Sequence, residues 1–176
     1  MTENLAKQPN LLPQAPEVLY LFGLPGAGKT YIGDLIARES TYHHYNADDD
    51  FTPTMLKAID RREEFSDEMR DEFYELISKK LPRLVEQYKN VIVSQATFRR
   101  QHRDMIRHAL DDLEFVWVQA PQSVIIQRLR ARGNEVTSEY FKKVAPNFEA
   151  PEKDCKSIVN DKDDTHIIDT FRHWYN

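Results

Sequence analysis

The stretch Leu21–Thr30, LFGLPGAGKT, decides the fold of this chain. From Gly23 onward it fits G-x-x-x-x-G-K-[ST], the pattern of a phosphate-binding loop. The apolar run 17–22 precedes it and predicts a buried strand of a parallel sheet. Apolar residues follow at helical spacing: Ile32, Leu35 and Ile36. A glycine-rich turn can match the pattern by chance, but a position between a strand and a helix indicates a nucleotide-phosphate site.

Each part of this loop has a physical role. Glycines permit positive φ, so consecutive N–H groups can turn towards one anion. The helix that begins at Lys29 directs unpaired N–H groups and its positive dipole end to the same place. Lys29 supplies a mobile cation for the outer phosphates, and the Thr30 hydroxyl can ligate Mg²⁺. We therefore expect ATP and Mg²⁺ as cofactors, with ATP held by Gly23, Leu24, Pro25, Gly26, Ala27, Gly28, Lys29, Thr30 and Tyr31.

Predicted strands and helices alternate along the rest of the chain. We expect strands at 17–22, 42–46, 90–95, 113–120 and 165–170, with only a very short helix after the last. A long helix is expected after the N-cap Ser66, broken or kinked near Pro82. This order predicts an α/β, three-layer P-loop NTPase fold: a mainly parallel five-stranded sheet with helices on both faces. Residues 1–16 are expected to form an irregular arm, and 17–176 a single kinase domain with a lid around 133–150.

The bulk composition narrows the class of partner. The 176 residues carry a formal net charge of −5, which argues against a surface for nucleic acid. The N-terminus does not resemble a secretory signal, no apolar run reaches membrane-spanning length, and Cys155 is the single cysteine. We expect a cytoplasmic protein, monomer or homodimer, with a small-molecule acceptor and no membrane or nucleic-acid partner.

Acidic residues follow the second predicted strand. In an open α/β sheet the ligand crevice lies beyond the carboxyl ends of the strands, so this strand delivers Asp48, Asp49 and Asp50 to the crevice. Phosphoryl transfer to an alcohol needs one carboxylate near Mg²⁺ and one that accepts the hydroxyl proton. In an extended segment Asp48 and Asp50 point the same way, which favours these two as catalytic. The alternative is a solvated acidic loop or a helix cap.

Arginines gather after the later strands. Arg99 and Arg103 lie one turn apart after the third strand and would bind an anionic acceptor; a surface basic patch is the alternative. Arg128 and Arg132 lie one turn apart before the predicted lid, where they would cover the nucleotide and stabilise the transferring phosphoryl group. Arg70 lies at the edge of the apolar stripe of the long helix, where a guanidinium could clamp a carboxylate or phosphate.

Taken together, these motifs resemble the small P-loop kinases of the shikimate kinase and gluconokinase type over about 18–170. The sequence NADDDF resembles the acidic motif that holds magnesium and the acceptor in those enzymes. The stretch FSDEMRDEF resembles a gluconokinase segment, and by that match Arg70 would contact the acceptor's carboxylate. The stretches VIVSQATFRRQHRDMIR and QRLRARG resemble the segments that carry Arg103 and that lead to the lid.

The resemblance also has departures. Ser94–Thr97 replaces the Cys-Ser-Ala run of gluconokinases, and Asn134 and Glu135 replace the His-Phe pair of their lid. Gln95 and Ala96 stand where shikimate kinases have a glycine pair. The resemblance implies an ATP-dependent kinase that phosphorylates a hydroxyl of a small anionic metabolite, with a gluconate-like sugar acid first. Two alternatives stay open: a polynucleotide- or zeta-toxin-type kinase, and an ATP-binding or ATPase module that has no acceptor.

Overall fold

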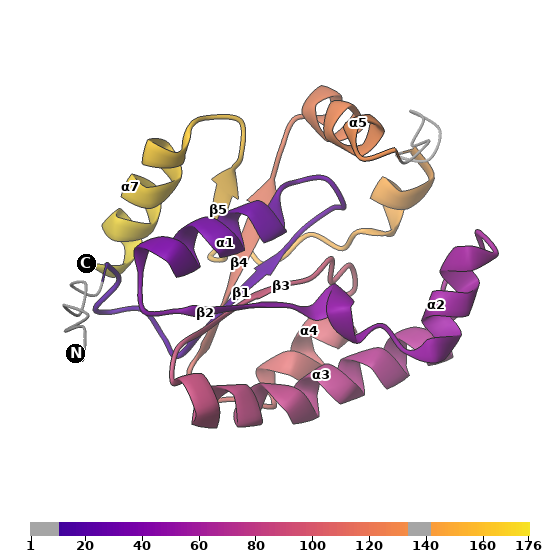
Figure 1. Cartoon of the computed structure of the whole chain (residues 1–176), viewed down its shortest axis with the longest axis horizontal. Helices are drawn as coiled ribbons and strands as arrows, with labels where there is room; N and C mark the ends of the chain where they lie inside the picture. The colour runs from indigo at the N-terminus through magenta and orange to yellow at the C-terminus, as the bar shows by residue number, and fades with distance from the viewer. Residues whose placement is uncertain (1–10, 134–141) are drawn as a thin grey trace, which may run out of the picture.

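The computed structural model describes residues 11–133 and 142–176 (Figure 1). Strands and helices alternate from β1 to α7, as the sequence predicts. The elements are β1 (Val18–Phe22), α1 (Lys29–Glu39), β2 (His43–Asn46), the 3₁₀ helix η1 (Ala47–Asp50), α2 (Pro53–Asp60), α3 (Asp67–Tyr88), β3 (Val91–Ser94), α4 (Arg100–Arg107), β4 (Leu113–Gln119), α5 (Gln122–Ala131), the 3₁₀ helix η2 (Ala145–Asn147), β5 (Lys156–Val159) and α7 (Asp164–Tyr175).

The sheet has five parallel strands in the order β2-β3-β1-β4-β5. The central strand β1 pairs with β3 on one side, Val18 opposite Val91, and with β4 on the other, Val18 opposite Leu113. Every residue of β1 is buried, as its continuous apolar sequence predicts for a strand covered on both faces. The α/β fold with a parallel five-stranded sheet is confirmed.

Helices cover both faces of the sheet (Figure 1). Alternate residues of β1 face opposite layers: Leu19 and Leu21 pack in one core cluster, whereas Val18, Tyr20 and Phe22 pack in the other. The first cluster takes in the apolar faces of α1 and α7, and the second those of α2, α3 and α4. This three-layer arrangement fixes the loop after β1 at the carboxyl edge of the sheet.

Helix α3 is the long helix that the sequence predicts, and it continues past Pro82. The Ser66 hydroxyl accepts a hydrogen bond from the Met69 N–H at 3.2 Å, which confirms the predicted N-cap. The expected break near Pro82 is wrong, because the helix runs unbroken from Asp67 to Tyr88. Buried Ile77 and Leu81 before the proline, and partly buried Leu84 and Val85 after it, pack in the same core cluster. This packing holds both halves in one helix despite the missing N–H.

The end of the chain differs from the prediction. Residues 165–170, expected as the fifth strand, lie in helix α7, and the fifth strand is β5 at Lys156–Val159. The Asp163 side chain caps α7 by accepting from the His166 N–H at 3.0 Å. Buried residues then recur every four positions along the helix: Ile167, Phe171 and Tyr175. This helical period outweighs the β-branched composition, and the expectation of a very short final helix is wrong for the same reason.

The described part of the N-terminal arm is irregular and packed. Leu12 is buried in the cluster beneath α1 and α7, and the Gln14 N–H donates to the Tyr175 carbonyl at 3.0 Å. Residues 1–10 lie outside the described part of the chain. In residues 11–133 and 142–176 no helix combines the length and the apolar character needed to cross a membrane.

Candidate active site

The loop after β1 presents unpaired backbone donors at the start of α1. Gly28 is the N-cap at φ 98°, a left-handed conformation that only glycine adopts at little cost. The first helical hydrogen bond runs from the Ile32 N–H to the Gly28 carbonyl at 3.0 Å, and no side chain caps the helix. The N–H groups of Lys29, Thr30 and Tyr31 therefore have no intrahelical acceptor. Together with the helix dipole, they form a site for an anion.

Two side chains from the far half of the sequence hold this loop in shape. Arg128 of α5 donates to the Ala27 carbonyl at 3.1 Å and to the Asn160 carbonyl at 2.9 Å. The buried Asn160, which follows β5, donates from Nδ2 to the Ala27 carbonyl at 3.0 Å. Arg128 thus makes its contacts with the loop backbone, so a contact with nucleotide remains a prediction. Asn160 had no motif in the sequence that could have marked it.

Gly28 gives the first testable prediction. A Cβ at Gly28 would lie 2.0 Å from Asn160 Nδ2, so Gly28→Ala adds a clash to the left-handed strain. We expect a loss of about 1–3 kcal/mol of unfolding free energy and weaker ATP binding. Gly133→Ala is the matched control, because Gly133 has φ 76° and nothing within 4 Å of its Cβ position. Denaturant unfolding and ATP titration of both variants check this; equal losses would contradict the role of Asn160.

Lys29 lies buried beside the loop, with its ammonium folded back on the backbone. Its Nζ donates to the Leu24 carbonyl at 2.9 Å. Burial lowers the pKa of Lys29 to about 8, with Asp48 opposing the shift and Arg132 adding to it. These charge effects place Asp48 and Arg132 near the ammonium group. A phosphate chain bound here would add to the negative charge that Asp48 supplies to Lys29.

Asp48 is the acidic residue that the structure brings to the loop. It lies in η1, and Gln95 Nε2 donates to its Oδ1 at 2.8 Å. The side-chain oxygen Oε1 of Gln95 in turn accepts from the Ala96 N–H, so both ends of the Gln95 side-chain amide are held. Removal of water raises the pKa of Asp48, while the Gln95 hydrogen bond and the Lys29 charge oppose the rise. Gln95, known from the sequence only as a departure from the kinase pattern, thus orients Asp48.

Asp50 points elsewhere, so the expectation that Asp48 and Asp50 share a direction is wrong. The segment is a 3₁₀ helix rather than an extended strand, and residues two apart then diverge around the axis. The Asp50 carboxylate accepts from the Tyr45 hydroxyl and pairs with the Lys80 ammonium of α3. These hydrogen bonds and the Lys80 charge lower the pKa of Asp50, although partial burial opposes them. The structure does not bring Asp50 together with Lys29.

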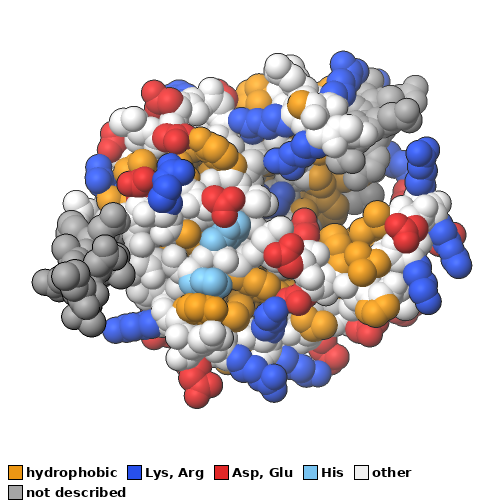
Figure 2. Space-filling model, in the orientation of Figure 1, with side chains coloured by type: hydrophobic (Ala, Val, Ile, Leu, Met, Phe, Trp, Pro, Cys, Tyr) orange, Lys and Arg blue, Asp and Glu red, His pale blue; other side chains and the backbone are white. Residues whose placement is uncertain are grey.

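The donor set beside Lys29 fits a magnesium ion. Thr30 offers a hydroxyl in the first turn of α1, and Asp48 offers a carboxylate whose Oδ1 accepts from Gln95. Oxygen donors in this small number are typical of Mg²⁺, which keeps several waters and bridges to substrate phosphates. Figure 2 shows Lys and Arg side chains over α5 and acidic side chains near η1, with a depression between them.

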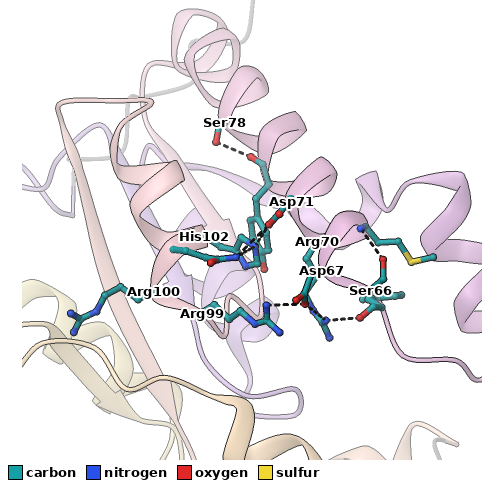
Figure 3. Close-up of polar contacts among 12 residues, drawn as sticks. Ser66, Asp67, Arg70, Asp71, Ser78, Arg99, Arg100 and His102 are labelled. Atoms are coloured by element: carbon teal, nitrogen blue, oxygen red, sulfur yellow. Dashed lines mark hydrogen bonds and ion pairs between the residues drawn. The ribbon is translucent and has the colours of Figure 1, made fainter.

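A second charged group lies on the α3 side of the site (Figure 3). Arg99 Nη1 contacts Asp67 Oδ1 at 2.8 Å, and Arg70 Nη1 lies 3.7 Å from the same oxygen. Buried Tyr74 lies within the electrostatic influence of both Asp48 and Arg70, whose charges have opposite effects on the pKa of its hydroxyl. Arg70 and Arg99, both predicted to bind the acceptor, therefore converge on the Asp67 carboxylate.

Arg103 has a different environment from Arg99. Its guanidinium donates to the carbonyls of Thr97, Phe98 and Glu149, and it is almost fully buried. It also lies over the ring of Phe22 at 5.0 Å from the centroid. Arg103 thus makes its hydrogen bonds with backbone carbonyls, and its contact with an acceptor remains a prediction. In the described structure it ties the loop after β3 to the segment before β5.

Part of the predicted lid, 133–150, lies outside the described residues, which omit 134–141 and with them Asn134 and Glu135. Its near end, Arg132, follows α5 and influences Lys29 electrostatically. At the other end, Lys143 pairs with Glu64 at 2.5 Å. A cover over the nucleotide therefore stays a prediction.

Two histidines, His102 buried and His44 half-buried, join polar groups of different elements. His44 joins Asp34 at 2.7 Å and Ser94 at 2.9 Å through its two ring nitrogens. His102 contacts Asp71 at 2.8 Å and stacks on the Tyr74 ring at 4.3 Å. Neither contact could be read from the sequence, because each joins elements that are distant along the chain.

His102 gives a prediction about pH. Burial lowers the pKa of His102, and Asp71 only partly opposes this, so the folded protein keeps the ring neutral where an unfolded chain binds a proton. Stability is therefore lost as pH falls below about 6.5, by at most about 1.4 kcal/mol per pH unit. His102→Gln should show a smaller loss than wild type between pH 7.5 and 5.5 in denaturant titrations. Identical pH slopes for the two proteins would contradict this.

The parallel sheet, the loop that opens α1 and the acid opposite it define an enzyme class, the ATP-dependent P-loop kinases of small molecules. A family model described as an AAA domain matches residues 18–151, and the chain belongs to this family.

Relatives with known names point in the same direction. Adenylyl-sulfate kinase of Gloeothece citriformis (strain PCC 7424) is 30% identical over 88% of this chain and 92% of its own length. Thermosensitive gluconokinase of Escherichia coli (strain K12) is 24% identical over 82% of this chain and 78% of its own. The crystal structure of a gluconokinase from Sinorhizobium meliloti 1021 has the same fold, with a TM-score of 0.78 and 21% identity over 91% of each chain.

Proposed function

We propose that this kinase transfers the γ-phosphoryl group of ATP to a hydroxyl of a small anionic metabolite, with a gluconate-like sugar acid as the first candidate. The observation that carries the proposal is the convergence of Arg70 and Arg99 on one carboxylate, with Arg99 about four residues after the Gln95 that binds Asp48. Two guanidinium groups that hold a carboxylate in the free protein fit a carboxylate of an acceptor. Gluconokinases of Escherichia coli and Arabidopsis thaliana among the relatives support the same substrate class.

The residues of the site divide the work of transfer. The loop N–H groups and Lys29 bind the β- and γ-phosphates and hold the reacting phosphorus in place. The Asp48 carboxylate, held by Gln95, accepts the proton of the attacking hydroxyl or orients that hydroxyl. Arg132 lies near enough to Lys29 to stabilise charge on the transferring group. Arg70 and Arg99 hold the acceptor's anionic end away from the phosphorus.

Thr30 and Asp48 would hold magnesium. The ion, when bound, neutralises the charge of the phosphate oxygens and keeps the β- and γ-phosphates in one geometry. Asp50 has a structural role in this proposal, because its carboxylate already binds the Tyr45 hydroxyl and the Lys80 ammonium. It fixes η1 to α3, and so fixes the direction of Asp48.

A second acceptor class has one observation in its favour. The relative at 30% identity is an adenylyl-sulfate kinase, whose name implies an anionic nucleotide acceptor. The same arginines could bind a sulfate or phosphate group. Adenylyl sulfate and 5′-hydroxyl oligonucleotides therefore belong in any test beside sugar acids.

The test is a coupled assay of ADP formation with Mg²⁺ and ATP over a panel of acceptors. The panel holds gluconate and other sugar acids, shikimate, neutral sugars, adenylyl sulfate, nucleosides, nucleotide sugars and 5′-hydroxyl oligonucleotides. We expect stimulation by a sugar acid and none by its neutral sugar. Stimulation by adenylyl sulfate alone would favour the nucleotide as acceptor over a sugar acid. ATP hydrolysis that no acceptor stimulates would favour an ATPase module instead.

A further inference from the structure

One carboxylate lies between two guanidinium groups on the acceptor side of the site (Figure 3). Asp67 begins α3, Arg70 lies one turn later, and Arg99 precedes α4. The Asp67 Oδ1 atom is 2.8 Å from Arg99 Nη1 and 3.7 Å from Arg70 Nη1. The group carries a net charge of +1 with Asp67 in place, and +2 once Asp67 turns away.

The three side chains differ in exposure and in the contacts that hold them. The Asp67 side chain is 63% exposed, against 27% for Arg70 and 34% for Arg99. Arg70 also donates to the Phe65 carbonyl, so the backbone anchors its guanidinium. Within the ranges that the structure describes, the Asp67 carboxylate has no partner besides these two arginines. A rotamer change can therefore place Asp67 in water while Arg70 keeps its position.

We propose that Asp67 occupies the position of the acceptor's anionic group until the acceptor binds, and that its displacement sets the charge selectivity of the site. This rests on the proposed function, because it concerns the same acceptor side. An acid with one carboxylate replaces one negative charge by another between the same guanidinium groups. A neutral sugar offers no replacement, so Asp67 stays and occupies the space. The acceptor class is therefore a hydroxy acid rather than a neutral polyol.

A purely structural role for Asp67 makes the opposite prediction. If Asp67 only ties α3 to the loop before α4, its removal loosens Arg99 and weakens anion binding. If Asp67 competes with the ligand, its removal strengthens anion binding. Tighter binding in a variant cannot arise from a loss of stability, so its direction separates the two roles.

The test measures sulfate binding by calorimetry, with the phosphate loop saturated by Mg²⁺ and a non-hydrolysable ATP analogue. Asp67→Asn should bind sulfate about 3- to 10-fold more tightly than wild type, because it removes a competing exposed ion pair. Asp169→Asn is the matched control, since Asp169 is also 63% exposed and pairs with Arg172 at 3.6 Å. It should bind sulfate like wild type. Sulfate binding by Asp67→Asn that is equal to wild type, or weaker, overturns the proposal.

Two further measurements fix the location and separate this proposal from the function. Adding Arg99→Gln to Asp67→Asn should remove the gain in sulfate affinity. A gain that persists would mean that sulfate binds away from Arg99, which overturns the proposal. With gluconate as acceptor, Asp67→Asn should lower KM by a similar factor and leave kcat little changed. If no variant phosphorylated gluconate, the proposal of a sugar acid as acceptor would fall, but the result on sulfate binding would still stand. If Asp67→Asn turned over gluconate normally but bound sulfate no more tightly than wild type, only the displacement of Asp67 would be contradicted.

Discussion

Lys29→Ala is expected to lower phosphoryl transfer by about 10³-fold while leaving the protein folded. The ammonium group meets the β- and γ-phosphates and stabilises the charge that develops in the transition state, and one such donor is worth about 10²- to 10³-fold. Its buried position increases the effect, because there is little water to screen the charge. Steady-state ADP release with the best acceptor is the measurement.

The fold should tolerate this change. Burial lowers the pKa of Lys29 to about 8, which means that the folded protein without ligand holds the charged form at a cost. Loss of the ammonium removes that cost together with the hydrogen bond to the Leu24 carbonyl. The melting temperature should therefore stay near that of wild type, whereas ATP affinity falls. The control is Lys79→Ala, an exposed lysine that pairs with Glu75 at 3.6 Å. Full activity of Lys29→Ala would contradict the assignment of the loop after β1 as the phosphate-binding loop.

Asp48→Asn and Asp50→Asn should differ by at least one order of magnitude in kcat. Asp48 accepts from Gln95 and interacts with the charge of Lys29, so losing its charge would remove both the proposed proton acceptor and a proposed magnesium ligand. A positioned acid or base contributes about 10²- to 10⁴-fold. Asp50 pairs with Lys80, and breaking a pair that is partly exposed should cost about 1 kcal/mol or less of stability. We expect Asp50→Asn to keep activity within about tenfold of wild type.

The two aspartates thus control for each other, since the same change is made two residues apart. Kinetics at saturating ATP and acceptor, together with denaturant unfolding, check the prediction. If Asp50→Asn lost as much activity as Asp48→Asn without losing stability, the proton acceptor would be Asp50, as the sequence alone allowed.

The sequence predicted the phosphate loop and the parallel sheet because both depend on local patterns. The glycines of Gly23–Thr30 set the conformation of the loop, and the buried strands β1 and β3 are short runs that are mostly apolar. β5 was missed because this four-residue strand has only Ile158 buried. The nearby run THIIDT resembled a strand in composition, but the Asp163 cap and its four-residue period make it helical.

The predicted site residues were those with a motif, and the residues that orient them were not predictable. Asp48 and Asp50 diverge because η1 is a 3₁₀ helix, a local geometry that the acidic triplet does not specify. Arg103 and Arg128 bind backbone carbonyls that come from distant parts of the chain. Gln95 and Asn160 belong to the same class: each acts through a contact that only the folded sheet brings together.

Titration of the folded protein with Mg²⁺ and ATP by calorimetry tests the central claim most directly, that the start of α1 binds the phosphate chain of a nucleotide. The account predicts saturable binding at one site per chain, with affinity strongly reduced in Lys29→Ala and unchanged in Lys79→Ala. Heat that never saturates, or equal affinity in wild type and Lys29→Ala, would contradict it.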